Sequence, residues 1–189
     1  MGDTIVTAGS KIKAIRESKS ISRETVAERT GLTVQQIELI EGGESLSLSP
    51  MIKIARALGV RLGTFLDDVE SDGPVVCRKE DQNKGVRFNA SKNTSKHLNY
   101  YSLARAKSGR YMEPFFIDIN NTAGDDFTFS SHEGEEFIYC LDGAVEVVYG
   151  QKSYELNPGD SIYYDSIIEH RIQAINGAAK ILAVVYTPV

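Results

Sequence analysis

Apolar residues recur at helical spacing throughout the first 66 residues, where Phe65 is the only aromatic side chain. From about residue 98 onward the pattern changes to short runs rich in Val, Ile, Tyr and Phe, separated by Gly, Pro, Asp and Asn. Runs of this kind are typical of antiparallel β-structure. The pattern therefore predicts a two-domain α + β chain, with a helical domain over residues 1–68, a linker with a leading strand over 69–97, and a β-domain over 98–189.

Apolar spacing, capping residues and glycines predict five short helices in the helical domain. Their expected extents are about Ser10–Ser18, Ser22 to Gly31, Thr33 to Gly42, Ser49 to Gly59 and Val60 to Leu66. Ser22 and Ser49 have the residue type of an N-cap, and Pro50 follows Ser49 at the first helical position. Thr33 and Gln36 have the spacing of a capping box, in which each side chain bonds the other residue's backbone.

Short strands with hairpin turns are expected throughout the β-domain. The candidate strands are Tyr100–Ala104, Phe115–Ile119, Phe127–Phe129, Phe137–Leu141, Val145–Tyr149, Lys152–Leu156, Ser161–Tyr164, Arg171–Ala174 and Ile181–Tyr186. Asp142-Gly143 and Asn176-Gly177 are typical of tight hairpin turns. So many short strands predict a closed barrel or a two-sheet jelly roll.

Composition restricts the class of protein. Hydrophobic residues make up 41% of the chain and charged residues 25%, which is the balance of a soluble globular protein rather than a disordered one. No apolar run approaches the ~18 residues that cross a bilayer, and the first residues lack the pattern of a signal peptide, so we expect a cytoplasmic protein without a membrane partner. Cys77 and Cys140 lie far apart and are expected to be free thiols.

Charge is distributed unevenly between the two parts. The formal net charge of −5 argues against a protein that coats nucleic acid non-specifically. The first 66 residues carry a charge of +2, however, and the remainder carries −7. This mild asymmetry permits DNA binding by the helical domain without demonstrating it.

The helical domain resembles the lambda-repressor-like (Xre-type) helix-turn-helix family. The resemblance rests on Ser20 to Ala27 (SISRETVA) and Gly31 to Gly42 (GLTVQQIELIEG), and it covers roughly residues 8–66. In that family the third helix enters the major groove of DNA, and the starts of the second and third helices meet phosphates. The resemblance thus implies a five-helix DNA-binding domain.

Residue by residue, the resemblance implies a DNA-binding set at the helix starts. Thr33, Val34, Gln35 and Gln36 would face the bases or the groove rim, and Arg23 would face a phosphate. Glutamine can pair bidentately with adenine, and arginine suits phosphate. The open alternative is that these residues are only the solvated face of an amphipathic helix.

Two segments of the β-domain resemble the two cupin motifs. His132 to Gly143 (HEGEEFIYCLDG) is similar to the first motif, and Pro158 to Tyr164 (PGDSIYY), followed by His170, is similar to the second. The resemblance implies an all-β cupin barrel, which is a double-stranded β-helix or jelly roll. It supports the two-sheet or barrel architecture that the strand pattern predicts.

The cupin resemblance also implies a candidate metal or effector site. Cupins commonly hold a divalent metal at four positions, which correspond here to Ser130, His132, Glu136 and His170. Ser130 replaces the first histidine, so the remaining three residues form a 2-His-1-carboxylate set that suits Fe(II) and leaves coordination positions open. A divalent ion (Fe, Zn, Mn or Ni) and a metal-free organic effector are both open alternatives.

Three further residues are candidates for lining the same pocket. They are Tyr100, Ser130 and Cys140. Cys140 shares the strand parity of Glu136, although a small buried thiol is more often a packing residue than a ligand.

The domain order resembles that of Xre-cupin transcriptional regulators. It implies a non-enzymatic homodimer that binds a double-stranded DNA operator through the helices and a small-molecule effector through the cupin barrel. The same order is similar to the hydroxypropylphosphonate epoxidase family of non-haem iron enzymes, which is the main alternative. A metal-free interaction module is a third hypothesis, because fold alone does not determine function.

Overall fold

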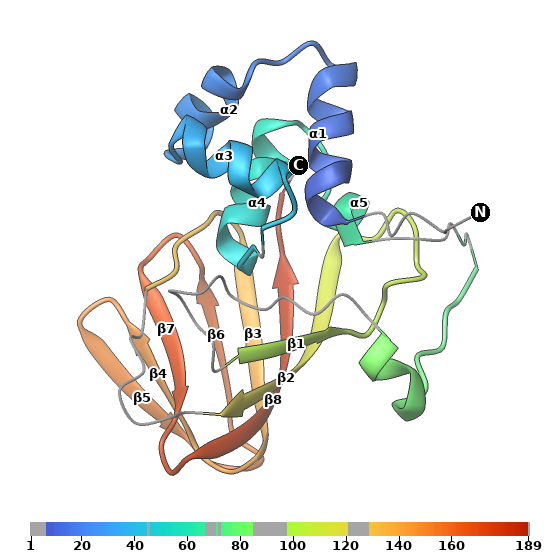
Figure 1. Ribbon diagram of the computed structural model, residues 1–189. Coiled ribbons are helices and arrows are strands. Elements are labelled where there is room, and N and C mark those ends of the chain that lie inside the picture. Colours follow the sequence, from blue (N-terminus) through green and yellow to red (C-terminus); the bar gives the residue numbers. More distant parts are fainter. Residues whose placement is uncertain are drawn as a thin grey trace.

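The computed structural model describes residues 7–44, 46–66, 71, 73–84, 98–120 and 129–188 of the chain. A helical unit lies against one end of a β-unit (Figure 1). The predicted two-part α + β organisation is confirmed, because all described α-helices precede all described strands.

The helical unit contains short helices with clear caps. The helices are α1 (Ala8–Ser18), α2 (Arg23–Thr30), α3 (Val34–Glu41), α4 (Leu48–Ala57) and α5 (Gly63–Leu66). Ser22 is confirmed as the N-cap of α2, and its hydroxyl accepts a hydrogen bond from the Thr25 amide. Gly31 ends α2 in the left-handed conformation at φ +73°, which glycine adopts without steric cost.

Helix α3 begins with the predicted capping box. The Thr33 hydroxyl accepts from the Gln36 amide at 3.1 Å, and the Gln36 side-chain oxygen accepts from the Thr33 amide at 2.8 Å. These two bonds satisfy backbone donors that have no partner inside the helix. The start of α3 is therefore fixed by its own side chains.

The predicted start of α4 was wrong by two residues. Ser47 is the N-cap, whereas Ser49 is buried within the first turn of α4. The Ser49 hydroxyl donates to the Ser131 carbonyl oxygen of the β-unit at 3.1 Å, so it satisfies a contact between the units instead of capping the helix. Pro50 fits here because the first-turn amides of a helix have no intrahelical acceptor.

Apolar side chains of four helices, α1, α3, α4 and α5, pack into a common core. Ile12, Ile37, Ile52 and Phe65 are at most 1% exposed. Burial of side chains of this size contributes about 1.5–3 kcal/mol each, so the packed faces hold the short helices together.

Eight described strands form two sheets. They are β1 (Leu98–Ser102), β2 (Met112–Asn120), β3 (Glu135–Asp142), β4 (Val145–Tyr149), β5 (Lys152–Leu156), β6 (Ser161–Asp165), β7 (His170–Ala174) and β8 (Ala178–Tyr186). One sheet has the order β1-β2-β8-β3-β6, and the other has the order β5-β4-β7. Every described strand pairing is antiparallel.

The connection predicted over 69–97, with its leading strand, is described only at residues 71 and 73–84. It contains a 3₁₀-helix over Lys79–Lys84, and β1 begins at Leu98 rather than at Tyr100. The predicted strand Phe127–Phe129 lies largely outside the described residues, since only Phe129 is described.

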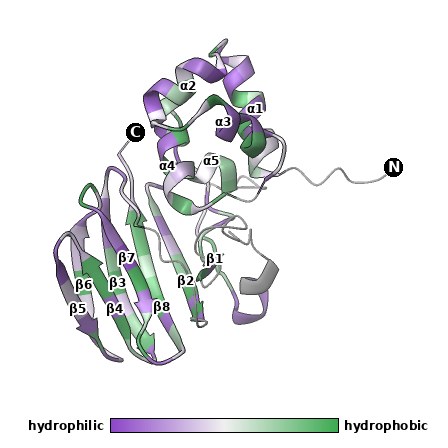
Figure 2. Cartoon of the chain, turned by 60° about the vertical axis from the view of Figure 1, so that its left-hand side comes forward, coloured by the Kyte–Doolittle hydropathy of each residue, from purple (hydrophilic) through white to green (hydrophobic). Residues whose placement is uncertain are grey.

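The core of the β-unit lies between the sheets. Buried and less buried residues alternate along β2 and β8, as expected for strands with one face in a core. Phe115, Ile138, Val147 and Ile181 are fully buried. Hydrophobic and hydrophilic residues alternate accordingly along the strands in Figure 2. None of the described helices has the length and apolar character of a membrane span.

Candidate functional site

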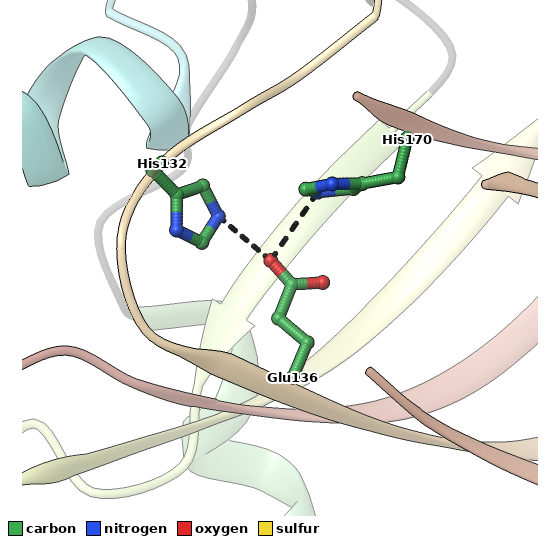
Figure 3. A group of neighbouring side chains, drawn as sticks. All are labelled: His132, Glu136 and His170. Carbon is green, nitrogen blue, oxygen red and sulfur yellow. Dashed lines mark hydrogen bonds and ion pairs between the residues drawn. The ribbon is translucent and has the colours of Figure 1, made fainter. Parts of the chain in front are cut away.

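Three of the predicted site residues meet at one place in the β-unit. His132, Glu136 and His170 are 3%, 6% and 3% exposed, and one ligand atom from each lies within 4.8 Å of the others. Figure 3 shows both imidazoles directed toward the carboxylate of Glu136. The structure thus brings together donors that are 38 positions apart in the chain.

Both sheets contribute to this cluster. Glu136 lies on β3 of the five-stranded sheet, and His170 begins β7 of the three-stranded sheet. His132 precedes β3, and its amide donates to the Ser166 carbonyl oxygen at 3.0 Å. Ser130 pairs with His170 through two backbone hydrogen bonds of 2.8 and 2.9 Å, which tie the two histidine-bearing segments together.

A glycine permits the close turn between His132 and Glu136. Gly134 has φ +111°, and a Cβ at this position would lie 2.0 Å from the Tyr186 carbonyl oxygen. Any other residue would both strain the backbone and collide with the end of β8. Gly134 therefore lets the loop that carries His132 reach the site.

Backbone carbonyls orient both imidazoles. The Nδ1 atom of His170 lies 2.8 Å from the Ile168 carbonyl oxygen, and Nδ1 of His132 lies 3.2 Å from the Glu133 carbonyl oxygen. A carbonyl only accepts, so each Nδ1 carries a proton, and a ring that is neutral presents a lone pair at Nε2. Metal-binding histidines in proteins are commonly held in this way.

The Glu136 carboxylate is shared between the histidines and a tyrosine. Its Oε1 lies 2.8 Å from His132 Nε2 and 3.7 Å from His170 Nε2. Its Oε2 accepts a 2.6 Å hydrogen bond from the Tyr164 hydroxyl. One carboxylate oxygen is thereby directed at the two imidazoles and the other is occupied.

This donor set fits a cation. With neutral histidines, two nitrogen lone pairs face a carboxylate oxygen in a buried site, which is unfavourable unless a positive charge lies among them. A divalent metal supplies that charge, and two imidazoles with one carboxylate form a set that leaves coordination positions open. The three side chains can therefore hold a metal ion.

The titration behaviour of the cluster agrees with this need for positive charge. Burial acts to raise the pKa of Glu136, but the two facing imidazoles outweigh it and lower that pKa well below its usual range. Burial acts to lower the pKa of His170, yet the Glu136 carboxylate outweighs it and raises that pKa. Burial and then the Glu136 charge raise the pKa of Tyr164, so its hydroxyl stays protonated and donates.

Tyr164 is a site residue that the sequence analysis missed. It pairs with Glu136 in the register between β6 and β3, and its ring centroid lies 5.0 Å from that of His170. The available signal was its position at the end of the second cupin-like motif. Strand parity alone does not say which partner strand lies beside that position.

The other pocket-lining candidates have different surroundings. The Tyr100 ring stacks edge-on against Phe115 at 5.8 Å, and burial followed by the charge of Glu136 raises the pKa of its hydroxyl. Cys140 lies in the hydrophobic core further along β3, with its Sγ 3.7 Å from the Gly143 carbonyl oxygen. The structure thus packs Tyr100 against Phe115 and gives Cys140 a packing role.

The predicted DNA-binding residues lie around the start of α3 but are not equally available. Val34 and Gln35 are exposed, and Thr33 is the N-cap. The Gln36 side-chain oxygen is occupied by the capping box, which leaves only its amide group for another partner. The Arg23 guanidinium faces Glu41 Oε2 at 2.8 Å and Glu38 Oε1 at 3.4 Å.

The chain matches two protein families and is similar to several known proteins. Residues 12–65 match the helix-turn-helix family, and residues 121–185 match the cupin domain family. The chain is 28% identical over 187 residues to the (S)-2-hydroxypropylphosphonic acid epoxidase of Streptomyces wedmorensis, with 92% of each chain covered.

Two regulators are similar over nearly the same length. The HTH-type transcriptional regulator PuuR of Escherichia coli K12 is 24% identical over 190 residues, which cover 100% of this chain and 98% of PuuR. The crystal structure of an HTH_3 family transcriptional regulator from Vibrio cholerae superposes with a TM-score of 0.70 at 21% identity, covering 96% of each chain. This protein therefore consists of a helix-turn-helix domain followed by a cupin domain, the domain order that it shares with both PuuR and the epoxidase.

Proposed function

We propose that this chain is a sequence-specific DNA-binding transcriptional regulator whose cupin domain binds a divalent metal or a small effector at His132, Glu136 and His170. In this proposal residues 1–68 form the DNA-binding domain, 69–97 the connection, and 98–189 a sensor domain whose two sheets close into a barrel. Similarity to PuuR over the full length supports the regulator assignment.

The observation that carries the proposal is the exposed surface of α3. Val34 is 38% exposed and Leu39 is 48% exposed, and Gln35 is exposed beside them. Apolar and amide side chains on an exposed helix surface suit thymine methyl groups and adenine edges in the major groove. The capping box holds this surface in a fixed conformation.

Electrostatics predict weak binding by a single domain. Helix α3 carries Glu38 and Glu41 and no basic residue, and Arg23 is paired with both of these carboxylates. Phosphate contacts supply most of the affinity for DNA of any sequence. We therefore propose that the protein binds DNA as a homodimer, in which two weak domains act together.

Replacing Gln35 with Ala is expected to weaken binding to the preferred duplex by about 1–3 kcal/mol and to leave binding to random duplexes nearly unchanged. The preferred sequence is first obtained by selection from random duplexes, and affinities are then measured by fluorescence anisotropy at one fixed salt concentration. Thr64→Ala on α5 is the matched control, because its side chain is exposed in the same unit. If selection yields no preferred sequence, the regulator proposal fails.

The outer face of the five-stranded sheet supports a dimer. Tyr163, Phe137 and Val184 lie in one row across three strands, and Tyr139 and Leu182 lie in the next. Tyr163 is 62% exposed and Tyr139 is 38% exposed. We therefore propose this face as the contact between two copies.

A carboxylate on that face should separate the copies. Tyr163→Glu is expected to shift the protein from dimer to monomer at micromolar concentration, because a charge at an apolar contact must be desolvated. Light scattering measures the mass, and Gln151→Glu in the exposed turn between β4 and β5 is the control. A monomeric unaltered chain would refute the dimer.

An epoxidase-type non-haem iron enzyme is the second candidate. It is favoured by the 28% identity to the Streptomyces enzyme over 92% of both chains and by the two-histidine, one-carboxylate donor set. The test is oxygen consumption by the Fe(II)-loaded protein with (S)-2-hydroxypropylphosphonic acid. Turnover above the rate of a His170→Ala variant would replace the regulator proposal.

A further inference from the structure

The helical unit contacts the β-unit at the loop that carries His132. The Ser49 hydroxyl of α4 donates to the Ser131 carbonyl oxygen at 3.1 Å. The Arg56 guanidinium of the same helix forms an ion pair with the Glu133 carboxylate. Helix α4 therefore holds both residues that flank His132.

Of three consecutive carbonyl groups, two hold the opposite side of this loop and the third orients His170. The Ser166 oxygen accepts from the His132 amide at 3.0 Å, and the Ile167 oxygen accepts from the Ser131 hydroxyl at 2.9 Å. The Ile168 oxygen accepts from His170 Nδ1 at 2.8 Å. A displacement of either histidine is therefore transmitted to the loop that α4 holds.

Helix α4 is in turn joined to the helix-turn-helix pair. Arg29 of α2 donates to the Ala57 carbonyl oxygen at the end of α4 at 2.8 Å. Arg56 also donates to the Pro188 carbonyl oxygen, beyond the end of β8, at 3.5 Å. A continuous set of bonds thus runs from the candidate metal site through α4 to α2.

We propose that Ser49 and Arg56 are positioning residues that couple occupancy of the site at His132, Glu136 and His170 to the docking of the helix-turn-helix domain. The proposal rests on the proposed metal site and adds its regulation. Coupling between two sites is reciprocal, so contacts that hold the loop for α4 also favour metal binding. Loss of those contacts weakens metal binding, although neither residue touches the metal ligands.

A merely structural role would give a different result. The Arg56 and Glu133 side chains are 33% and 51% exposed, and exposed pairs of this kind contribute little to stability. The Ser49 to Ser131 bond is a single neutral hydrogen bond. We therefore expect variants at these positions to fold and to change metal affinity much more than melting temperature.

The experiment is a Co(II) titration of the full chain, followed by the visible absorption of the bound ion. The double variant Ser49→Ala/Arg56→Ala is expected to bind Co(II) at least about fivefold more weakly than the unaltered chain. Lys53→Ala is the control, because Lys53 is half-buried on the same helix and forms no hydrogen bond or ion pair with the part of the chain that is described. Reversing the pair with Arg56→Glu/Glu133→Arg should restore affinity relative to Arg56→Glu alone.

Hydrogen exchange gives a second measurement that does not depend on DNA. Co(II) should slow amide exchange in α4 of the unaltered chain and have no such effect in the double variant. Equal Co(II) affinity and equal exchange in the two proteins would overturn the coupling while leaving the metal site intact. Failure of the unaltered chain to bind Co(II) would overturn the proposed metal site and the coupling together.

Discussion

Replacing Glu41 with Gln is expected to lower the free energy of unfolding of the helical domain by about 3–5 kcal/mol, the usual cost of breaking a buried ion pair from one side. The Glu41 side chain is fully buried at the end of α3. It accepts from Arg16 Nη2 of α1 at 3.0 Å and from Arg23 Nε of α2 at 2.8 Å. One carboxylate thus joins three helices, and its loss leaves the Arg16 and Arg23 guanidinium groups without their buried charge partner.

Urea denaturation followed by circular dichroism measures this loss. Glu38→Gln is the matched control, because Glu38 also pairs with Arg23, at 3.4 Å, but its side chain is 65% exposed. Exposed pairs contribute about 0–1 kcal/mol, so the control should unfold close to the unaltered protein. Equal effects of the two substitutions would contradict the structural role of Glu41.

The same carboxylate predicts a pH dependence. Burial acts to raise the pKa of Glu41, but hydrogen bonds from Arg16 and Arg23 outweigh it and lower that pKa below its value in the unfolded chain. The contribution of Glu41 is therefore fully present above the unfolded pKa of about 4.3 and is lost as pH falls through the lower folded value. The difference in stability between the unaltered protein and Glu41→Gln should be constant near pH 7 and shrink in acid.

Local signals in the sequence were sufficient for much of the helical unit. The Ser22 cap, the Thr33 capping box and the Gly31 terminus depend on residues within a few positions of one another. The start of α4 could not be predicted in this way, because Ser49 is bonded to Ser131, which lies 82 residues further along the chain. The contact between the two units thus gives Ser49 a different role from the N-cap role that its residue type suggests.

The same distinction separates the found and missed parts of the candidate site. Strand parity and the two cupin-like motifs were enough to nominate His132, Glu136 and His170, which the structure brings together. Tyr164 was missed because its contact with Glu136 depends on the register of β6 against β3. Arg23 was nominated as a phosphate contact from its own short segment. Its hydrogen bond to Glu41, which lies 18 residues later in the chain, could not be predicted from that segment.

Replacing Glu136 with Gln is expected to abolish metal-dependent stabilisation without destabilising the metal-free protein. In the unaltered chain, free metal at 100 times its dissociation constant should raise the free energy of unfolding by about 2.7 kcal/mol. A neutral amide is a poor metal ligand beside two imidazoles, so this increase should disappear. Glu155→Gln on β5 is the control, because its side chain is exposed.

The expected stability of the metal-free Glu136→Gln protein follows from the hydrogen bonds of the cluster. The amide oxygen of a glutamine can accept from the Tyr164 hydroxyl, which now donates to Oε2 at 2.6 Å. The amide nitrogen can then donate to His132 Nε2, where a carboxylate oxygen now lies at 2.8 Å and, with the ring neutral, both atoms carry lone pairs. The substitution thus removes the buried charge and the conflict between acceptors at once. Thermal unfolding with and without Co(II) measures both effects, and a metal-free Glu136→Gln protein that melts well below the unaltered chain would show that the carboxylate is stabilised by something other than a bound cation.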